Sequence, residues 1–139
     1  MNIMLMLMVA CLRLHNPIGL TIDEIDQMNR VVMSEAGGES AECQEAVATV
    51  IINRAYSDKF PNTVSGVLAQ KKQFSFHNNG EPTTEVKLSV LKALMHHGTD
   101  EQIINRSAYY FRRGTYHNFG IPETHIDNTY FSLAEDYVE

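Results

Sequence analysis

The stretch Ala46-Val47-Ala48-Thr49-Val50-Ile51-Ile52 is apolar at every position but one. A helix at the surface would show a polar face every three or four residues, and this run offers none. We therefore expect it to lie in a central helix that is buried on nearly every side. Ser40 is suited to cap that helix, which is predicted to run over residues 41–56.

A second helix is predicted immediately upstream. Thr21-Ile22-Asp23-Glu24 has the form of a capping box, in which the first and last residues satisfy each other's backbone donors. Apolar residues then follow at helical spacing, namely Ile22, Ile25, Met28 and Val32. The pattern predicts a helix over residues 22–34 that ends at Gly37-Gly38, where a glycine can supply a left-handed residue.

Two further helices and a loop are predicted downstream. Thr63 is placed to cap a short helix that reaches about Gln70. The Gln-, His-, Asn- and Gly-rich residues 71–83 indicate a surface loop or small hairpin. A helix over residues 84–97 should end at Gly98, and its inward-facing residues are predicted to be Val90, Leu91, Leu94 and Met95.

The tail of the chain favours β-structure because of its aromatic content. Ala108-Tyr109-Tyr110-Phe111 and Asn128-Thr129-Tyr130-Phe131 are the two segments that show it. Aromatic pairs of this kind mostly pack in a core, although they can also stack on sugar rings. Helices followed by a small C-terminal β element predict an α+β fold that is mainly α.

Composition limits the possible function classes. The 139 residues suit one domain, and 11 Lys and Arg against 17 Asp and Glu give a net charge of −6. Such a balance argues against a general nucleic-acid binder, which needs a surplus of cations. Cys11 and Cys43 provide no disulfide framework, and we expect both to be free thiols.

The N-terminal segment contains ten apolar residues, from Ile3 to Leu12. A transmembrane helix needs about 20, so we expect no membrane span here. A signal peptide would carry positive charge before the run, but only Met1 and Asn2 precede it. If the run were part of a lipoprotein cleavage site, Cys11 would be the lipidated residue. We interpret residues 1–19 as an apolar extension, either a leader or an extra helix, and residues 20–139 as the functional domain.

Glu35 is the residue that most suggests chemistry. It falls in the last turn of a predicted helix, where the macrodipole disfavours a negative charge. Met33 adds desolvation, and both effects raise the pKa of a carboxyl, as a general acid requires. Glu39 would share its face only if the helix continued through the two glycines. On this pattern alone, a solvated glutamate at a helix end is the more common interpretation.

Metal-dependent chemistry is the main alternative. His117, His125 and Asp127 could supply three zinc ligands, but spacing of that kind is common by chance. The chain has no His-Glu-x-x-His motif, no nucleophile elbow and no glycine-rich phosphate loop. We expect no metal and no other cofactor.

Four blocks in order resemble the SleB/CwlJ-type cell wall hydrolases, a family that includes spore-cortex-lytic enzymes and phage lysis proteins. The resemblance spans roughly residues 22–133. The blocks are Glu35-Ala36-Gly37-Gly38-Glu39; Gln44 with Ala46-Val47-Ala48 and Val50-Ile51-Ile52-Asn53-Arg54; Phe60-Pro61-Asn62-Thr63-Val64; and Gln73-Phe74-Ser75-Phe76, followed by the two aromatic tail segments. The chain departs from the family pattern at Thr129, where histidine is usual, and in having no tryptophan.

The resemblance implies a lysozyme-like catalytic domain that cuts the glycan strand of peptidoglycan. Glu35 matches the family's catalytic acid, and many members are lytic transglycosylases that cleave the β-1,4 bond between N-acetylmuramic acid (MurNAc) and N-acetylglucosamine (GlcNAc), leaving 1,6-anhydro-MurNAc ends. The resemblance implies that the partner is the glycan strand. It also implies that the protein acts on the cell wall as a monomer. The implied substrate-binding residues are Glu39, Asn53, Gln73, Phe74, Ser75, Tyr109 and Tyr110, although a structural role suits Asn53 equally.

Three alternatives remain open on the sequence. A muramidase of the same fold would use water and need a second carboxylate, for which Glu39 is the candidate. A zinc-dependent amidase or peptidase would cut the stem peptide instead. A non-catalytic wall-binding or phage structural protein is the third.

Overall fold

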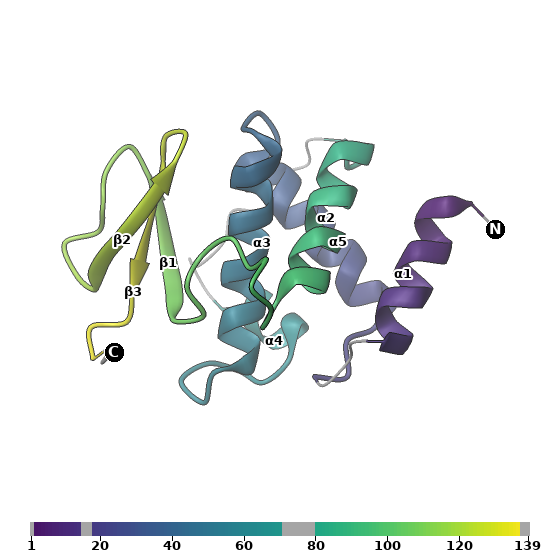
Figure 1. The fold of residues 1–139 in the computed structure, drawn as a ribbon, viewed down its shortest axis with the longest axis horizontal. Helices are drawn as coiled ribbons and strands as arrows, with labels where there is room; N and C mark the ends of the chain where they lie inside the picture. The colour runs from purple at the N-terminus through teal and green to yellow at the C-terminus, as the bar shows by residue number, and fades with distance from the viewer. Residues whose placement is uncertain (1, 15–17, 71–79, 137–139) are drawn as a thin grey trace.

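Helix α3 (Ala41–Tyr56) is the centre of the fold, as its apolar sequence predicts. Every residue from Cys43 to Ala55 is buried. A computed structural model describes residues 2–14, 18–70 and 80–136 (Figure 1). The other helices are α1 (Ile3–Leu14), α2 (Ile22–Ala36), α4 (Val64–Leu68) and α5 (Thr84–His96). Helices α2, α4 and α5 all pack on α3.

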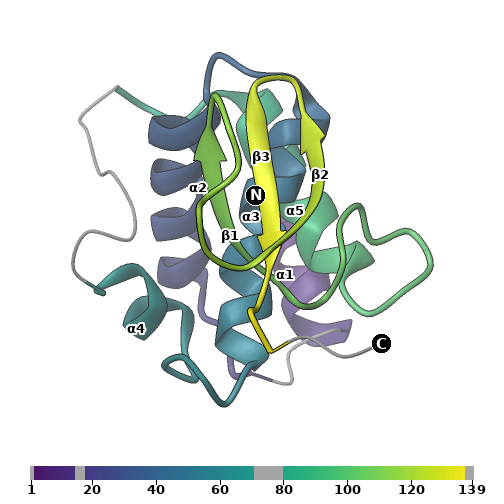
Figure 2. The same ribbon diagram turned by 90° about the vertical axis from the view of Figure 1, so that its left-hand side faces the viewer.

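Three antiparallel strands cover the remaining side of α3. They are β1 (Ala108–Arg113), β2 (Ile121–Ile126) and β3 (Thr129–Leu133), in the order β1-β3-β2. The sheet lies on one side of α3, and α2 and α5 lie on the other, as Figures 1 and 2 show. Phe131 on the central strand is fully buried and pairs with Phe111 on β1. The α+β, mainly α fold is confirmed.

The predicted helix starts are confirmed in detail. Thr21 and Glu24 form both halves of the capping box at the start of α2. The side chains of Ser40 and Thr63 accept hydrogen bonds from the backbone amides of Cys43 and Gly66 at the starts of α3 and α4. Local polar residues therefore determine where these helices begin.

Several boundaries differ from prediction. Helix α2 extends to Ala36 and α4 stops at Leu68. Gly37 is right-handed, with φ −61°, and its amide continues the helical hydrogen bonding to the Met33 carbonyl, so no left-handed glycine ends α2. Strand β2 was not predicted, because its sequence Ile-Pro-Glu-Thr-His-Ile has a weak strand pattern and pairs only with β3. Most of the predicted 71–83 loop lies outside the described residues.

Two predicted core residues are exposed. Met95 is 53% exposed and Ile22 is 42% exposed. Met95 lies about 180° around α5 from the buried Val86, because nine residues at about 100° each complete two and a half turns. The other inward residues of α5 predicted above are buried.

Helix α1 packs against α5, with Met4 partly buried against the core. Ile3, Met6 and Leu7 remain exposed. Among the described residues, no helix combines the length and apolar character needed to cross a bilayer. Cys43 is a buried free thiol, as predicted, whereas the side chain of Cys11 lies outside the described part.

Candidate active site

One buried side chain on α3, that of Gln44, holds the loop between α2 and α3. Its amide nitrogen lies 3.2 Å from the carbonyl oxygens of both Ala36 and Glu39. Its amide oxygen accepts a hydrogen bond from the hydroxyl of Ser89 on α5 at 3.0 Å. Because buried carbonyls need partners, these contacts fix the backbone that directly follows Glu35.

The same loop is tied to the sheet. The backbone N–H of Ser40 donates to Oδ2 of Asp127, in the turn between β2 and β3, at 3.0 Å. The Ser40 side chain, together with this backbone hydrogen bond, holds the pKa of Asp127 below its usual value. Arg113 at the end of β1 pairs with the carboxylate of Glu39, whose side chain is only 13% exposed. Figure 2 shows the loop and the β2–β3 turn at the same end of the molecule.

Glu35 lies in the last turn of α2, directly before this anchored loop. Its side chain is partly buried, and so is that of Met33 in the same turn. No basic residue occupies that turn. The carboxyl therefore belongs to the turn where the helix dipole presents its negative end.

Tyr109 and Tyr110 lie on β1 beside a buried arginine. The guanidinium of Arg54, on α3, donates through Nε to the carbonyl oxygen of Tyr109 at 2.7 Å. It lies 4.9 Å from the ring centre of Phe60 and 5.7 Å from that of Tyr110. Burial lowers the pKa of Arg54 to about 10, so it remains a cation at neutral pH. Arg54 thus connects the two tyrosines to α3.

Asn53 is buried near the other end of α3. Its amide nitrogen donates to the carbonyls of Asn105 and Ala108, both at 3.0 Å. Asn53 and Tyr109 line a cavity at that end, and Glu35 is not among its lining residues. Of the predicted site residues, the structure therefore brings Glu35 and Glu39 to the N-terminal end of α3, and Asn53 and Tyr109 to its C-terminal end.

Some predicted residues lie elsewhere. Gln73, Phe74 and Ser75 fall outside the described residues. His117 hydrogen-bonds the carbonyl of Phe111, and the His125 ring stacks on Tyr130. Within residues 2–14, 18–70 and 80–136, no three His, Cys, Asp or Glu side chains gather closely enough to hold a metal ion.

The sequence did not predict the contacts that Gln44, Arg54, Arg113 and Asp127 make at this site. Gln44 had a usable signal, since a polar residue at the start of a buried helix needs buried partners. Arg54 had a similar signal, because it is a charged residue in the same buried helix. Asp127 had none, because its contact with Ser40 joins residues 87 positions apart.

Known proteins identify the class to which this fold and site belong. A sequence profile described as "Cell Wall Hydrolase" matches residues 38–132, about two-thirds of the chain. The chain belongs to the cell wall hydrolase family. Glu35 lies just ahead of the matched range.

Named relatives narrow the comparison to spore cortex-lytic enzymes. That of Oceanobacillus iheyensis is 38% identical over 103 residues, which cover 71% of this chain and 36% of the relative. That of Bacillus subtilis is 33% identical over 103 residues, covering 71% of this chain and 32% of the relative. The chain thus spans about a third of the length of these curated relatives.

Solved structures match a larger share of this chain and of their own length. The catalytic domain of the Bacillus cereus SleB protein is 28% identical, with a TM-score of 0.67, and the match covers 84% of this chain and 94% of that one. The catalytic domain of the germination-specific lytic transglycosylase SleB from Bacillus anthracis is also 28% identical, with a TM-score of 0.65 and coverage of 84% and 98%. The fold described above is therefore that of SleB catalytic domains.

Proposed function

We propose that this protein cleaves the glycan strand of peptidoglycan at the MurNAc–GlcNAc β-1,4 bond, as a lytic transglycosylase with Glu35 as acid and then base. One observation carries the proposal. Glu35 lies in the last turn of α2, next to a loop that the side chains of Gln44, Arg113 and Asp127 hold in place. A proton donor must be positioned within a few tenths of an ångström, and a loop anchored in this way supports that precision.

The proposed chemistry needs one protein carboxyl. Protonated Glu35 gives its proton to the bridging oxygen, the glycosidic bond breaks, and positive charge develops at the muramyl anomeric carbon. The substrate's own N-acetyl oxygen stabilises that charge. The resulting carboxylate then takes the proton of the muramyl C6 hydroxyl, whose oxygen closes the 1,6-anhydro ring. Glu35 ends protonated, so no water is consumed.

The state of Glu39 favours a lyase over a water-using muramidase. A muramidase of the two-carboxylate kind needs a second carboxylate to activate water or attack the sugar. Glu39, the candidate, is largely buried and paired with Arg113. Because its carboxylate is engaged by the Arg113 guanidinium, Glu39 is poorly placed to hold an attacking water. The B. anthracis relative is itself named a lytic transglycosylase.

Tyr109 and Tyr110 are proposed to contact the sugar rings, together with Gln73, Phe74 and Ser75. Aromatic faces stack on the apolar faces of sugars, and Arg54 holds the two tyrosines in place. In this proposal Glu39 supports the site through its pair with Arg113, and Asn53, at the other end of α3, holds the backbone that leads into the strand of the two tyrosines.

Product analysis tests the proposal. Purified sacculi are digested with the protein, and the released muropeptides are examined by mass spectrometry. We expect 1,6-anhydro-muramyl ends, in the presence or absence of a metal chelator. Reducing muramyl ends would instead identify a muramidase, and freed stem peptides an amidase or peptidase. Either result would overturn the proposed reaction.

A further inference from the structure

A cavity of about 560 Å³ opens where α3 and α5 end, at the far end of α3 from the loop that follows Glu35. Ligand pockets commonly have volumes of roughly 300–1,000 Å³. Its lining includes the apolar residues Leu20, Ile52 and Leu94. It also includes aromatic and polar residues, among them Tyr56, His97 and Arg106. The cavity is therefore suited to a small molecule with both kinds of surface.

The aromatic residues of the lining provide an acceptor for a ligand. Tyr56 is 45% exposed, and its ring packs on that of His97 with centroids 4.5 Å apart. Nε2 of His97 lies 3.1 Å from Oδ1 of Asn53. Because the Asn53 nitrogen donates to two backbone carbonyls, its oxygen is the acceptor, so Nε2 of His97 carries the proton.

The remaining ring nitrogen of His97, Nδ1, is then an acceptor. The hydrogen bonds found within the described residues give it no donor. Burial, helped by the positive charge of Arg106, lowers the pKa of His97 to about 4. The ring is therefore neutral at physiological pH, and Nδ1 can accept a hydrogen bond from a ligand N–H.

Arg106 makes the cavity attractive to an anion. It lines the cavity, and no Asp or Glu lies among the described lining residues. In the part of the chain that the structure describes, no carboxylate forms an ion pair with Arg106. A cation in a cavity whose described lining includes no carboxylate, in a chain of net charge −6, marks this cavity as an exception to the overall charge.

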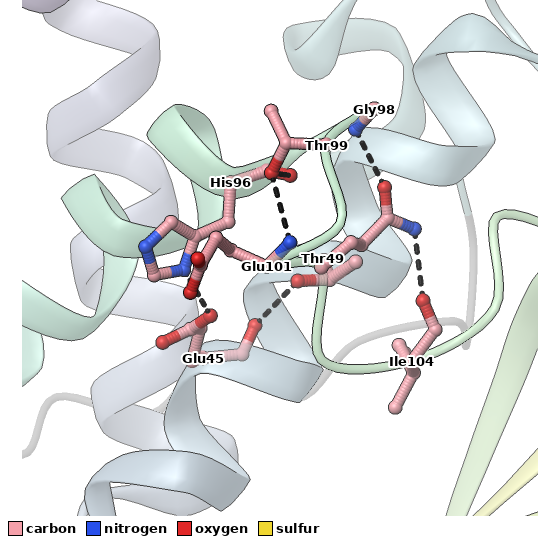
Figure 3. Close-up of polar contacts among 8 residues, drawn as sticks. Glu45, Thr49, His96, Gly98, Thr99, Glu101 and Ile104 are labelled. Atoms are coloured by element: carbon pink, nitrogen blue, oxygen red, sulfur yellow. Dashed lines mark hydrogen bonds and ion pairs between the residues drawn. The ribbon is translucent and has the colours of Figure 1, made fainter.

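The loop that carries Arg106 is already shaped by its own hydrogen bonds. The side chain of Gln102 accepts from the Gly98 amide at 2.7 Å and donates to the Ile104 carbonyl at 2.8 Å. The Thr99 hydroxyl donates to the His96 carbonyl at 2.6 Å. Figure 3 shows these contacts around Gly98, Thr99 and Ile104. A preformed loop lowers the entropy lost on binding.

We propose that this cavity binds a short N-acylated peptide that ends in a free carboxylate. The guanidinium of Arg106 pairs with the carboxylate, and Nδ1 of His97 accepts a peptide N–H. A small apolar side chain packs against Ile52 and Leu94. The stem peptide of peptidoglycan, which is N-acylated by the lactyl group of MurNAc, has this chemistry. Identifying the ligand as a stem peptide rests on the proposed function, whereas the peptide site itself does not.

Peptide titrations test the site. The probes are N-acetyl-Ala-Ala with a free carboxylate, its C-terminal amide, and the D,D form of the acid, each followed by amide NMR shifts. We expect the acids to shift the Gly98 and Ser107 amides, with a Kd on the order of 1 mM for ligands this small. The amide should bind about tenfold more weakly, because it lacks the charge-assisted bonds to Arg106.

The two enantiomers distinguish the possible sources of the peptide. Peptidoglycan stems contain D-residues, whereas proteins contain L-residues. Tighter binding of the D,D acid supports a stem peptide as the ligand, and tighter binding of the L,L acid overturns that identification in favour of a protein-derived peptide.

Matched variants complete the test. Arg106→Gln should reduce the affinity for the acid about tenfold, to that of the amide, whereas Arg112→Gln, an exposed cation on the sheet, should leave it unchanged. Equal binding of acid and amide, or equal effects of the two variants, would overturn the proposal. Peptide binding should persist in Glu35→Gln, so a failure of the peptide site and a failure of the glycan-cleavage proposal are seen in separate experiments.

Discussion

The backbone amide of Ser40 donates to Oδ2 of Asp127 at 3.0 Å, joining the cap of α3 to the β2–β3 turn. Asp127 has a φ of 51°, a left-handed conformation that Asp and Asn tolerate better than most residues. The turn therefore presents its carboxylate to the loop that follows Glu35. The sheet acts on the proposed active site through this contact and through the Arg113–Glu39 pair.

Asp127→Ala removes the acceptor for the Ser40 amide. We expect the rate of sacculus cleavage to fall about two- to tenfold, the usual effect of losing one hydrogen bond. Asp127→Asn keeps an acceptor oxygen and suits the left-handed backbone, so it should retain most of the rate. Turbidity clearing of sacculi measures both variants, and equal rates for them would show that the contact does not support catalysis.

Gln44→Leu keeps the approximate size of the side chain and removes the partner of two carbonyls. The free energy of unfolding should fall by about 2–4 kcal/mol, because the Ala36 and Glu39 carbonyls lose a buried donor. Ser89→Ala removes the hydroxyl that contacts the Gln44 oxygen and the Glu85 carbonyl, but it leaves the Ala36 and Glu39 carbonyls their donor, so it should cost about 1 kcal/mol. Urea denaturation compares them. A neutral Gln44→Leu would contradict the role given to Gln44.

Adjacent glycines provide a steric test of the loop. A Cβ at Gly37 would lie 2.4 Å from the Met33 carbonyl oxygen, whereas one at Gly38 would meet nothing within 4 Å. Gly37→Ala should therefore destabilise the protein by about 1–3 kcal/mol, and Gly38→Ala by much less. Thermal unfolding of both variants measures the difference. Similar melting temperatures for the two variants would contradict the close packing of Gly37 against the Met33 carbonyl.

His97 makes stability depend on pH. Its pKa is about 4 in the folded protein and about 6.5 when unfolded, so the unfolded chain binds the extra proton between these values. The stability that the neutral His97 ring contributes is fully present above pH 6.5. It is lost as the pH falls toward 4. The loss should be about 1–2 kcal/mol, reduced from the full pKa difference because solvent reaches part of the ring.

The pH prediction is checked by urea denaturation of wild type and His97→Gln from pH 4 to 7. Gln can still donate to Asn53 but does not titrate in this range. The variant should show a flatter pH dependence than wild type. Identical slopes would exclude His97 as the titrating group.

Local signals in the sequence predicted the helices well. The run at 46–52 predicts a buried helix, and Thr21, Ser40 and Thr63 cap their helices as expected. These features succeed because a cap or an apolar face depends on residues only a few positions apart.

Long-range features were not predictable from the sequence. Strand β2 is stabilised by pairing with β3 rather than by its own propensity. The roles of Asp127 and Arg113 depend on contacts across 87 and 74 residues. Glu35 could be placed at a helix end from local pattern, but the loop that follows it is held by side chains from α3 and the sheet.

The most direct test of the account is to compare Glu35→Gln with Glu42→Gln on purified sacculi. Both variants remove one carboxylate, and Glu42 is exposed in the first turn of α3. With folding verified by circular dichroism, Glu35→Gln should release 1,6-anhydro-muropeptides at least about 100-fold more slowly than wild type, since a general acid contributes about 10²–10⁴-fold. Glu42→Gln should match wild type. Wild-type rates in Glu35→Gln would contradict the assignment of Glu35 as the proton donor.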